Sequence, residues 1–123
     1  MVKEKTNKKI LIVEDNPINM MVITKMIQTI GDFELILATN GQEAVDLYTK
    51  EAPQVIFMDI QMPYMNGFEA YEEISKIVAM HKLEKPKVIA MTAYAMEKDR
   101  DRCLSLGMDE YISKPFKKEQ IVN

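Results

Sequence analysis

Cysteine, histidine and tryptophan are scarce: the 123 residues include one cysteine, one histidine and no tryptophan. Cys103 can form no disulfide bond within the chain, which fits a reducing compartment, so we expect a cytoplasmic protein. No apolar run approaches the roughly 20 residues of a membrane-spanning helix, and the polar N-terminus lacks the apolar core of a secretion signal. A net charge of −3 argues against nonspecific nucleic-acid binding, and the lack of a glycine-rich nucleotide loop argues against a kinase.

The chain does contain short apolar runs that alternate with segments of helical periodicity. We expect strands over residues 9–13, 34–38, 55–58, 88–91 and 111–113. Helices are expected after Asn16, Asn40 and the turn-forming Gly67, over the charged segment that begins at Glu97, and over residues 117–123. The first helix has a predicted buried stripe of Ile23, Met26, Ile27 and Ile30, whereas the fourth has only a thin apolar side of Met96, Cys103 and Leu104. This alternation predicts one α/β domain over residues 9–123, a doubly wound parallel sheet with helices on both faces, preceded by a flexible lead-in at 1–8.

Polar side chains stand at the C-terminal ends of four of these runs. They are Glu14 and Asp15, then Asp59, then Thr92, and finally Lys114. Because the carboxyl ends of parallel strands open into one crevice, we expect these side chains to converge there. Each residue alone has an ordinary explanation, such as a helix cap at Glu14-Asp15 or a turn at Asp59, but coincidence at four strand ends is improbable.

Three carboxylates in one crevice repel one another and therefore favour a bound cation. Oxygen ligands without a nearby histidine or cysteine indicate Mg²⁺ or Mn²⁺ rather than zinc. Asp59 stands alone on its loop, so it is the best candidate for a nucleophile that takes a phosphoryl group as an acyl phosphate. The Lys114 ammonium and the Thr92 hydroxyl would each bind a phosphoryl oxygen.

Five ordered motifs carry a resemblance to a known family. They are Val13-Glu14-Asp15-Asn16, Met58-Asp59-Ile60-Gln61-Met62-Pro63 with Met65-Asn66-Gly67, Met91-Thr92-Ala93, Gly107-Met108-Asp109-Glu110-Tyr111 and Lys114-Pro115-Phe116. From about Lys9 onward the chain resembles the receiver domain of a two-component response regulator, most closely those attached to hybrid sensor histidine kinases. The resemblance implies a flavodoxin-like α/β fold with strand order 2-1-3-4-5 and five helices. It also implies that the short closing helix is truncated.

The resemblance assigns roles to individual residues. Asp59 would accept a phosphoryl group, in a Mg²⁺-dependent reaction, from a phosphohistidine on a partner histidine kinase or phosphotransfer protein. Asp15 would bind the metal directly, Glu14 would assist, and the backbone carbonyl of Gln61 would complete the ligands. Thr92 and Tyr111 would form a switch pair that alters the surface of the fourth helix, fifth strand and fifth helix.

The resemblance also implies a cis peptide bond before Pro115, although the statistics of such bonds alone favour trans. As an isolated domain, the chain is expected to have no enzymatic activity beyond self-phosphorylation and self-dephosphorylation at Asp59, and to contact neither nucleic acid nor membrane. The sequence leaves undecided whether phosphorylation makes the domain dimerise.

Two other functions are alternatives to that of a phosphoryl acceptor. One is a pseudo-receiver, an interaction module that takes no phosphate, although the intact Asp59, Lys114 and acidic pair argue against it. The other is a phosphatase with an aspartate nucleophile. That class generally has a second aspartate two residues after the nucleophile, where this chain has Gln61.

Overall fold

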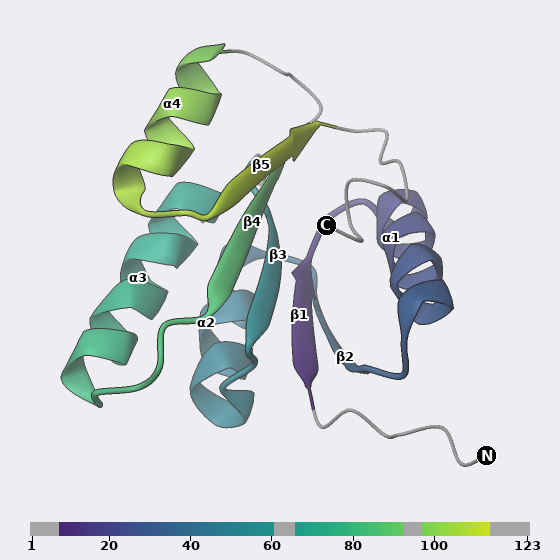
Figure 1. The fold of residues 1–123 in the computed structure, drawn as a ribbon, viewed down its shortest axis with the longest axis horizontal. Coiled ribbons are helices and arrows are strands. Elements are labelled where there is room, and N and C mark those ends of the chain that lie inside the picture. Colours follow the sequence, from purple (N-terminus) through teal and green to yellow (C-terminus); the bar gives the residue numbers. More distant parts are fainter. Residues whose placement is uncertain (1–7, 61–65, 93–96, 114–123) are drawn as a thin grey trace.

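The computed structural model describes residues 8–60, 66–92 and 97–113, and these residues form a parallel sheet with helices on both faces (Figure 1). The elements are β1 (Lys9–Val13), α1 (Pro17–Ile30), β2 (Glu34–Ala38), α2 (Gly41–Glu51), β3 (Val55–Asp59), α3 (Gly67–Met80), β4 (Lys87–Thr92), α4 (Glu97–Leu106) and β5 (Glu110–Ser113). The strand order is β2-β1-β3-β4-β5, and every pairing is parallel. The predicted doubly wound fold and its strand order are confirmed. The fifth predicted helix, at 117–123, lies outside the described residues.

Polar caps fix where the helices begin. Asn16 precedes α1, and its side-chain oxygen accepts hydrogen bonds from the backbone amides of Ile18 and Asn19. Asn66 precedes α3 and forms a reciprocal capping box with Glu69. None of the four described helices combines the length and the apolar character that a membrane-spanning helix needs.

The alternation of side chains along the strands divides the core into two clusters, one on each face of the sheet. On one face Ile23 and Ile27 of α1 pack against Ile10 and Ile12 of β1. On the other face α2, α3 and α4 cover residues such as Leu11, Val13, Ile56 and Met58, and contribute Tyr48, Phe68, Tyr71, Ile74 and Cys103. Because both faces are covered, the middle residues of the central strands β1, β3 and β4 are apolar.

Strands β3 and β4 extend beyond the ends that the sequence predicts. Strand pairing continues through Asp59, which pairs with Met91, and through Thr92, which pairs with Ser113. The amide of Ile60 also donates to the carbonyl of Met91 at 3.0 Å. Asp59 and Thr92 are therefore the last residues of paired strands, and their backbones are fixed by the sheet.

The opposite edge of the sheet, where the strands begin, carries contacts that join elements. The Lys9 ammonium donates to the Glu51 carboxylate at 2.9 Å and joins the start of β1 to the end of α2. This hydrogen bond raises the pKa of Lys9 and lowers the pKa of Glu51. The acidic side chains that the sequence singles out lie at the other edge, so the two ends of the sheet differ in chemistry.

Candidate functional site

Four of the predicted site residues lie at the carboxyl edge of the sheet. Glu14 and Asp15 directly follow β1, Asp59 ends β3, and Thr92 ends β4. These three strands are neighbours in the sheet, in the order β1-β3-β4. The structure therefore places Glu14, Asp15, Asp59 and Thr92 at the same edge of three neighbouring strands.

The acidic residues form a compact cluster. One carboxylate oxygen from each of Glu14, Asp15 and Asp59 lies within 4.8 Å of the others. Glu14 and Asp59 are each 1% exposed, whereas Asp15 is exposed. Such a spacing lets a single small cation contact several carboxylates, and oxygen-only ligands suit Mg²⁺. The donor set therefore fits the metal that the sequence predicts.

Two backbone contacts at the end of β1 hold Glu14 in place. The amide of Glu14 donates to the carbonyl of Ala38 at 3.0 Å, which continues the pairing of β1 with β2 by one residue. The Glu14 carboxylate accepts a hydrogen bond from the amide of Asn16 at 3.2 Å. Asn16, rather than the acidic pair, caps the amides of α1. The ordinary explanation of Glu14 and Asp15 as the helix cap is thus excluded.

Gly67 packs the first turn of α3 directly against the end of β3. A Cβ atom placed on Gly67 would lie 2.5 Å from the carbonyl oxygen of Asp59 and 2.6 Å from the Cα of Ile60. No side chain fits in that space, so glycine is required for this close approach. The sequence indicates only a turn-forming role for Gly67, because the close approach depends on the path of the chain.

Thr92 and Tyr111 lie on the same face of the sheet. Tyr111 pairs in register with Ala90, and Thr92 stands two residues after Ala90 on β4. Thr92 is fully buried, and Tyr111 is partly buried against the core cluster that contains Cys103 and Phe68. The two members of the predicted switch pair are therefore on adjacent strands, on the face that α3 and α4 cover.

Gln61, Lys114 and Pro115 lie outside the described residues. The metal contact of the Gln61 carbonyl, the phosphoryl contact of Lys114 and the peptide geometry at Pro115 stay predictions.

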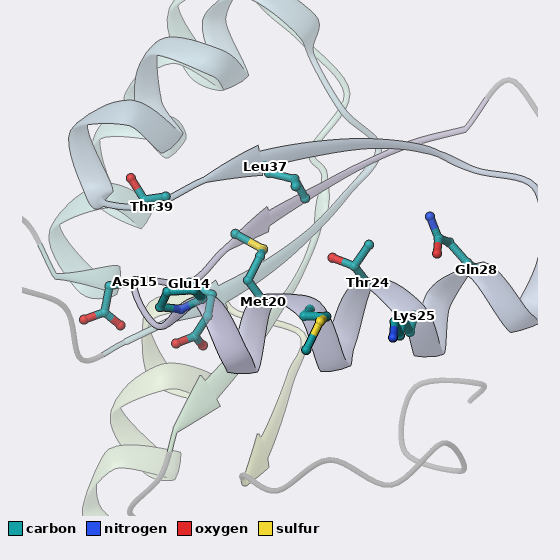
Figure 2. Close-up of a pocket in the computed structure, with 10 residues that line it drawn as sticks. Glu14, Asp15, Met20, Thr24, Lys25, Gln28, Leu37 and Thr39 are labelled. Atoms are coloured by element: carbon teal, nitrogen blue, oxygen red, sulfur yellow. The ribbon is translucent and has the colours of Figure 1, made fainter.

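A groove of about 460 Å³ begins at the acidic cluster and runs between α1 and β2. Figure 2 shows Glu14 and Asp15 at one end of the groove, and Lys25 and Gln28 farther along α1. Its apolar lining includes Met20, Met21 and Leu37, of which Met21 and Leu37 are exposed.

The buried stripe of α1 is the feature that the sequence makes evident, and it does not reveal this groove. A second apolar stripe, Ile18, Met21 and Val22, has helical spacing, and its member Met21 lines the groove.

Comparison with known proteins identifies the family. Residues 10–123 match the response regulator receiver domain family. The polar-differentiation response regulator DivK of Brucella anthropi is 39% identical over 109 residues, which are 89% of this chain and 85% of DivK. The chain therefore belongs to the response regulator receiver domain family.

Other relatives are much longer proteins. Hybrid signal transduction histidine kinase B of Dictyostelium discoideum is 38% identical over 93% of this chain, which spans only 6% of that kinase.

Solved structures with sequence identities of 28% and 34% share the fold, and they contain a partner protein and a magnesium ion, respectively. The receiver domain of Saccharomyces cerevisiae Ssk1, crystallised with the histidine phosphotransfer protein Ypd1, is 28% identical with a TM-score of 0.86, over 97% of this chain and 86% of that one. The receiver domain of the Pseudomonas aeruginosa sensor histidine kinase PA1611, with a magnesium ion in its active-site cleft, is 34% identical with a TM-score of 0.78. That match covers 94% of this chain and 92% of the other.

Proposed function

We propose that this receiver domain accepts a phosphoryl group on Asp59 from a phosphohistidine in a partner protein, in a reaction that requires Mg²⁺. The observation that carries the proposal is the cluster of Glu14, Asp15 and Asp59, in which carboxylate oxygens lie within 4.8 Å of one another at the carboxyl edge of the sheet. Among the three, Asp59 ends a central strand and is 1% exposed. Its fixed backbone presents the carboxylate to a donor in one geometry.

The reaction transfers one phosphoryl group. A carboxylate oxygen of Asp59 forms a bond to phosphorus while the bond between phosphorus and the imidazole nitrogen of the donor breaks. The bonding electrons leave with the imidazole, and the product on this chain is an acyl phosphate. The buried position of Asp59 limits the access of water, which helps the acyl phosphate to persist.

Asp15, Glu14 and Asp59 would hold the Mg²⁺ ion, with Asp15 exposed beside the two buried carboxylates. Bound Mg²⁺ would offset the negative charge that accumulates between Asp59 and the phosphoryl oxygens. Thr92 is the last residue of the adjacent strand, β4, and its buried hydroxyl would donate a hydrogen bond to one phosphoryl oxygen. Lys114 would provide the positive charge for another. The relative from Pseudomonas aeruginosa, which holds magnesium in its cleft, supports this assignment.

Phosphorylation would then change the surface of the molecule at α4 and β5. Movement of the Thr92 hydroxyl toward the phosphoryl group would free space next to Tyr111, which lies on the same face of the sheet. A two-state change of this kind converts a local charge into a new docking surface.

The exposed apolar face of α1 is the best candidate surface for the phosphohistidine donor. Ile18, Met21 and Val22 are spaced to share one side of the helix and are 67%, 51% and 37% exposed. Of this stripe, Met21 lines the groove that begins at Glu14 and Asp15, and Leu37 lines the same groove from β2. A contiguous apolar patch beside a reaction site marks a docking surface. We assign it to a protein that presents apolar residues around its phosphohistidine, and the co-crystal of the Ssk1 receiver with Ypd1 supports such a partner.

Phosphotransfer kinetics test the acceptor and the docking surface together. A phosphorylated histidine phosphotransfer protein should pass its phosphoryl group to the wild type but not to Asp59→Asn. Met21→Glu should slow this transfer by about tenfold, because a buried interface anchor typically contributes 1–2 kcal/mol. The same variant should react normally with acetyl phosphate, which needs no docking.

The matched control is Met80→Glu, since Met80 is exposed at the far end of α3. Equal transfer rates for Met21→Glu and Met80→Glu would exclude α1 as the docking surface for the donor. Transfer of the phosphoryl group to Asp59→Asn would exclude Asp59 as the acceptor. A wild type that takes no phosphoryl group would favour an interaction module.

A further inference from the structure

Over Arg100 to Leu106, helix α4 packs against the molecule through few side chains. From Arg100 to Leu106 only Cys103 is buried, and Leu104 and Leu106 are exposed on the surface. A helix with so little buried surface moves easily, so each remaining side-chain contact has a large influence on its position.

One of these contacts joins α4 to the start of α3. The guanidinium carbon of Arg102 lies over the ring of Phe68, 4.0 Å from the ring centroid. Phe68 is 6% exposed and belongs to the same core cluster as Cys103, whereas Arg102 is exposed. The flat, weakly hydrated guanidinium group favours this stacking, and the face of the aromatic ring attracts its positive charge.

The ring under Arg102 is one residue away from the contact between α3 and Asp59. Gly67 leaves no room for a Cβ against the carbonyl oxygen of Asp59, so the first turn of α3 rests on the end of β3. The capping box of Asn66 and Glu69 fixes that turn. A continuous set of packed groups therefore leads from the Asp59 backbone through Gly67 and Phe68 to Arg102.

The other end of α4 is fixed to the start of β4. The Lys85 ammonium donates to the carbonyl of Gly107 at 2.7 Å. Asp109 accepts from the amide of Val88 at 2.8 Å through its carboxylate, and its own amide donates to the carbonyl of Val88 at 2.9 Å. These contacts fix the C-terminal end of α4, which can therefore serve as a pivot for the helix.

We propose that Arg102 is a positioning residue for α4, which couples the helix to the Asp59 end of β3 through its stacking on Phe68. The corner at Gly107 is the pivot, and the stack limits how far the helix swings from it. The response of α4 to modification of Asp59 rests on the proposed function. The positioning of α4 in the unmodified protein does not.

Amide hydrogen exchange of residues 100–106 tests the positioning role in the unmodified protein. Arg102→Ala should speed exchange in α4 by about two- to fivefold, the range that a surface cation–π contact provides. Phe68→Leu should have a similar effect, and the double variant should exchange no faster than the faster single variant, because both changes remove one contact.

Matched variants separate stacking from charge and from loss of packing. Arg102→Lys should be intermediate, Phe68→Tyr should match the wild type because it keeps the ring, and Arg100→Ala should match it because Arg100 is exposed on the same helix. Equal exchange in Arg102→Ala and Arg100→Ala would overturn the proposal, as would additive effects in the double variant.

The second arm measures α4 exchange with and without acetyl phosphate and Mg²⁺, with the phosphorylated fraction read by intact mass. The change in α4 exchange on phosphorylation should be at least about twofold smaller in Arg102→Ala than in the wild type at equal phosphorylated fraction. An equal change would overturn the coupling and leave the phosphoacceptor function intact. If neither protein gains a phosphoryl group, the proposed function fails, and the first arm still decides the role of Arg102.

Discussion

Single residues at the carboxyl edge of the sheet fix the geometry of the acidic cluster. Glu14 is positioned by the carbonyl of Ala38 and the amide of Asn16, and Asp59 by its place at the end of a paired strand. Gly67 contributes by having no side chain, since it lets α3 rest on the backbone of Asp59. The cluster thus depends on backbone positions as much as on the carboxylates.

Gly67→Ala should destabilise the protein by about 1–3 kcal/mol, the usual effect of forcing a methyl group into a packed site. The added Cβ would meet rigid backbone atoms of Asp59 and Ile60, which cannot move aside. Urea denaturation measures the loss. Gly31→Ala is the control, because its Cβ would meet only the ring of Phe33, a side chain that can move, and its φ of −170° suits any residue. Equal losses in the two variants would contradict this interpretation of Gly67.

The sequence alone predicts the acidic residues and Thr92, because each follows an apolar run and parallel strands bring their carboxyl ends together. It could not predict the close approach at Gly67 or the Arg102–Phe68 stack. Both depend on how segments distant in the sequence pack in space, and neither leaves a periodic signal.

Among the elements, α1 has two apolar stripes, of which the sequence identifies only one as buried. Its buried stripe, which includes Ile23 and Ile27, is evident from periodicity and is confirmed. The exposed stripe of Ile18, Met21 and Val22 has the same spacing, but sequence alone does not tell which side of an apolar helix faces solvent. The thin apolar side predicted for α4 is confirmed over Arg100 to Leu106, where Cys103 alone is buried.

The cap of α1 connects helix stability to the acidic cluster, through the contact of the Asn16 amide with the Glu14 carboxylate. Asn16→Ala should cost about 1 kcal/mol of stability through the lost hydrogen bonds to Ile18 and Asn19. It should also weaken Mg²⁺ binding by about tenfold, since the Asn16 amide holds the Glu14 carboxylate and loosening this turn disturbs a supporting contact of the site. Calorimetric titration with Mg²⁺ measures the affinity.

Asn40→Ala supplies the control at the start of α2, where Asn40 caps the amide of Glu43. It should lose similar stability and bind Mg²⁺ normally. Equal Mg²⁺ affinity in Asn16→Ala and Asn40→Ala would show that the α1 cap does not support the acidic cluster.

At the scale of the whole molecule, the two edges of the sheet have separate roles. The edge where the strands begin carries the contact of Lys9 with Glu51, which joins elements. The opposite edge gathers the acidic cluster, the end of β4 and the start of the α1 groove. This division follows from parallel topology, because every strand presents its carboxyl end on the same side. The fold could therefore be predicted from the alternation of elements, and the place of the site followed from the fold.

The central claim is that Asp59 accepts a phosphoryl group with the help of Mg²⁺. Intact-mass analysis after incubation with acetyl phosphate tests it most directly, for the wild type and Asp59→Asn, each with and without Mg²⁺. The account predicts that the wild type gains the mass of one phosphoryl group only when Mg²⁺ is present, and that Asp59→Asn gains none. A wild type that stays unmodified in Mg²⁺, or an Asp59→Asn variant that gains the same mass, would contradict it.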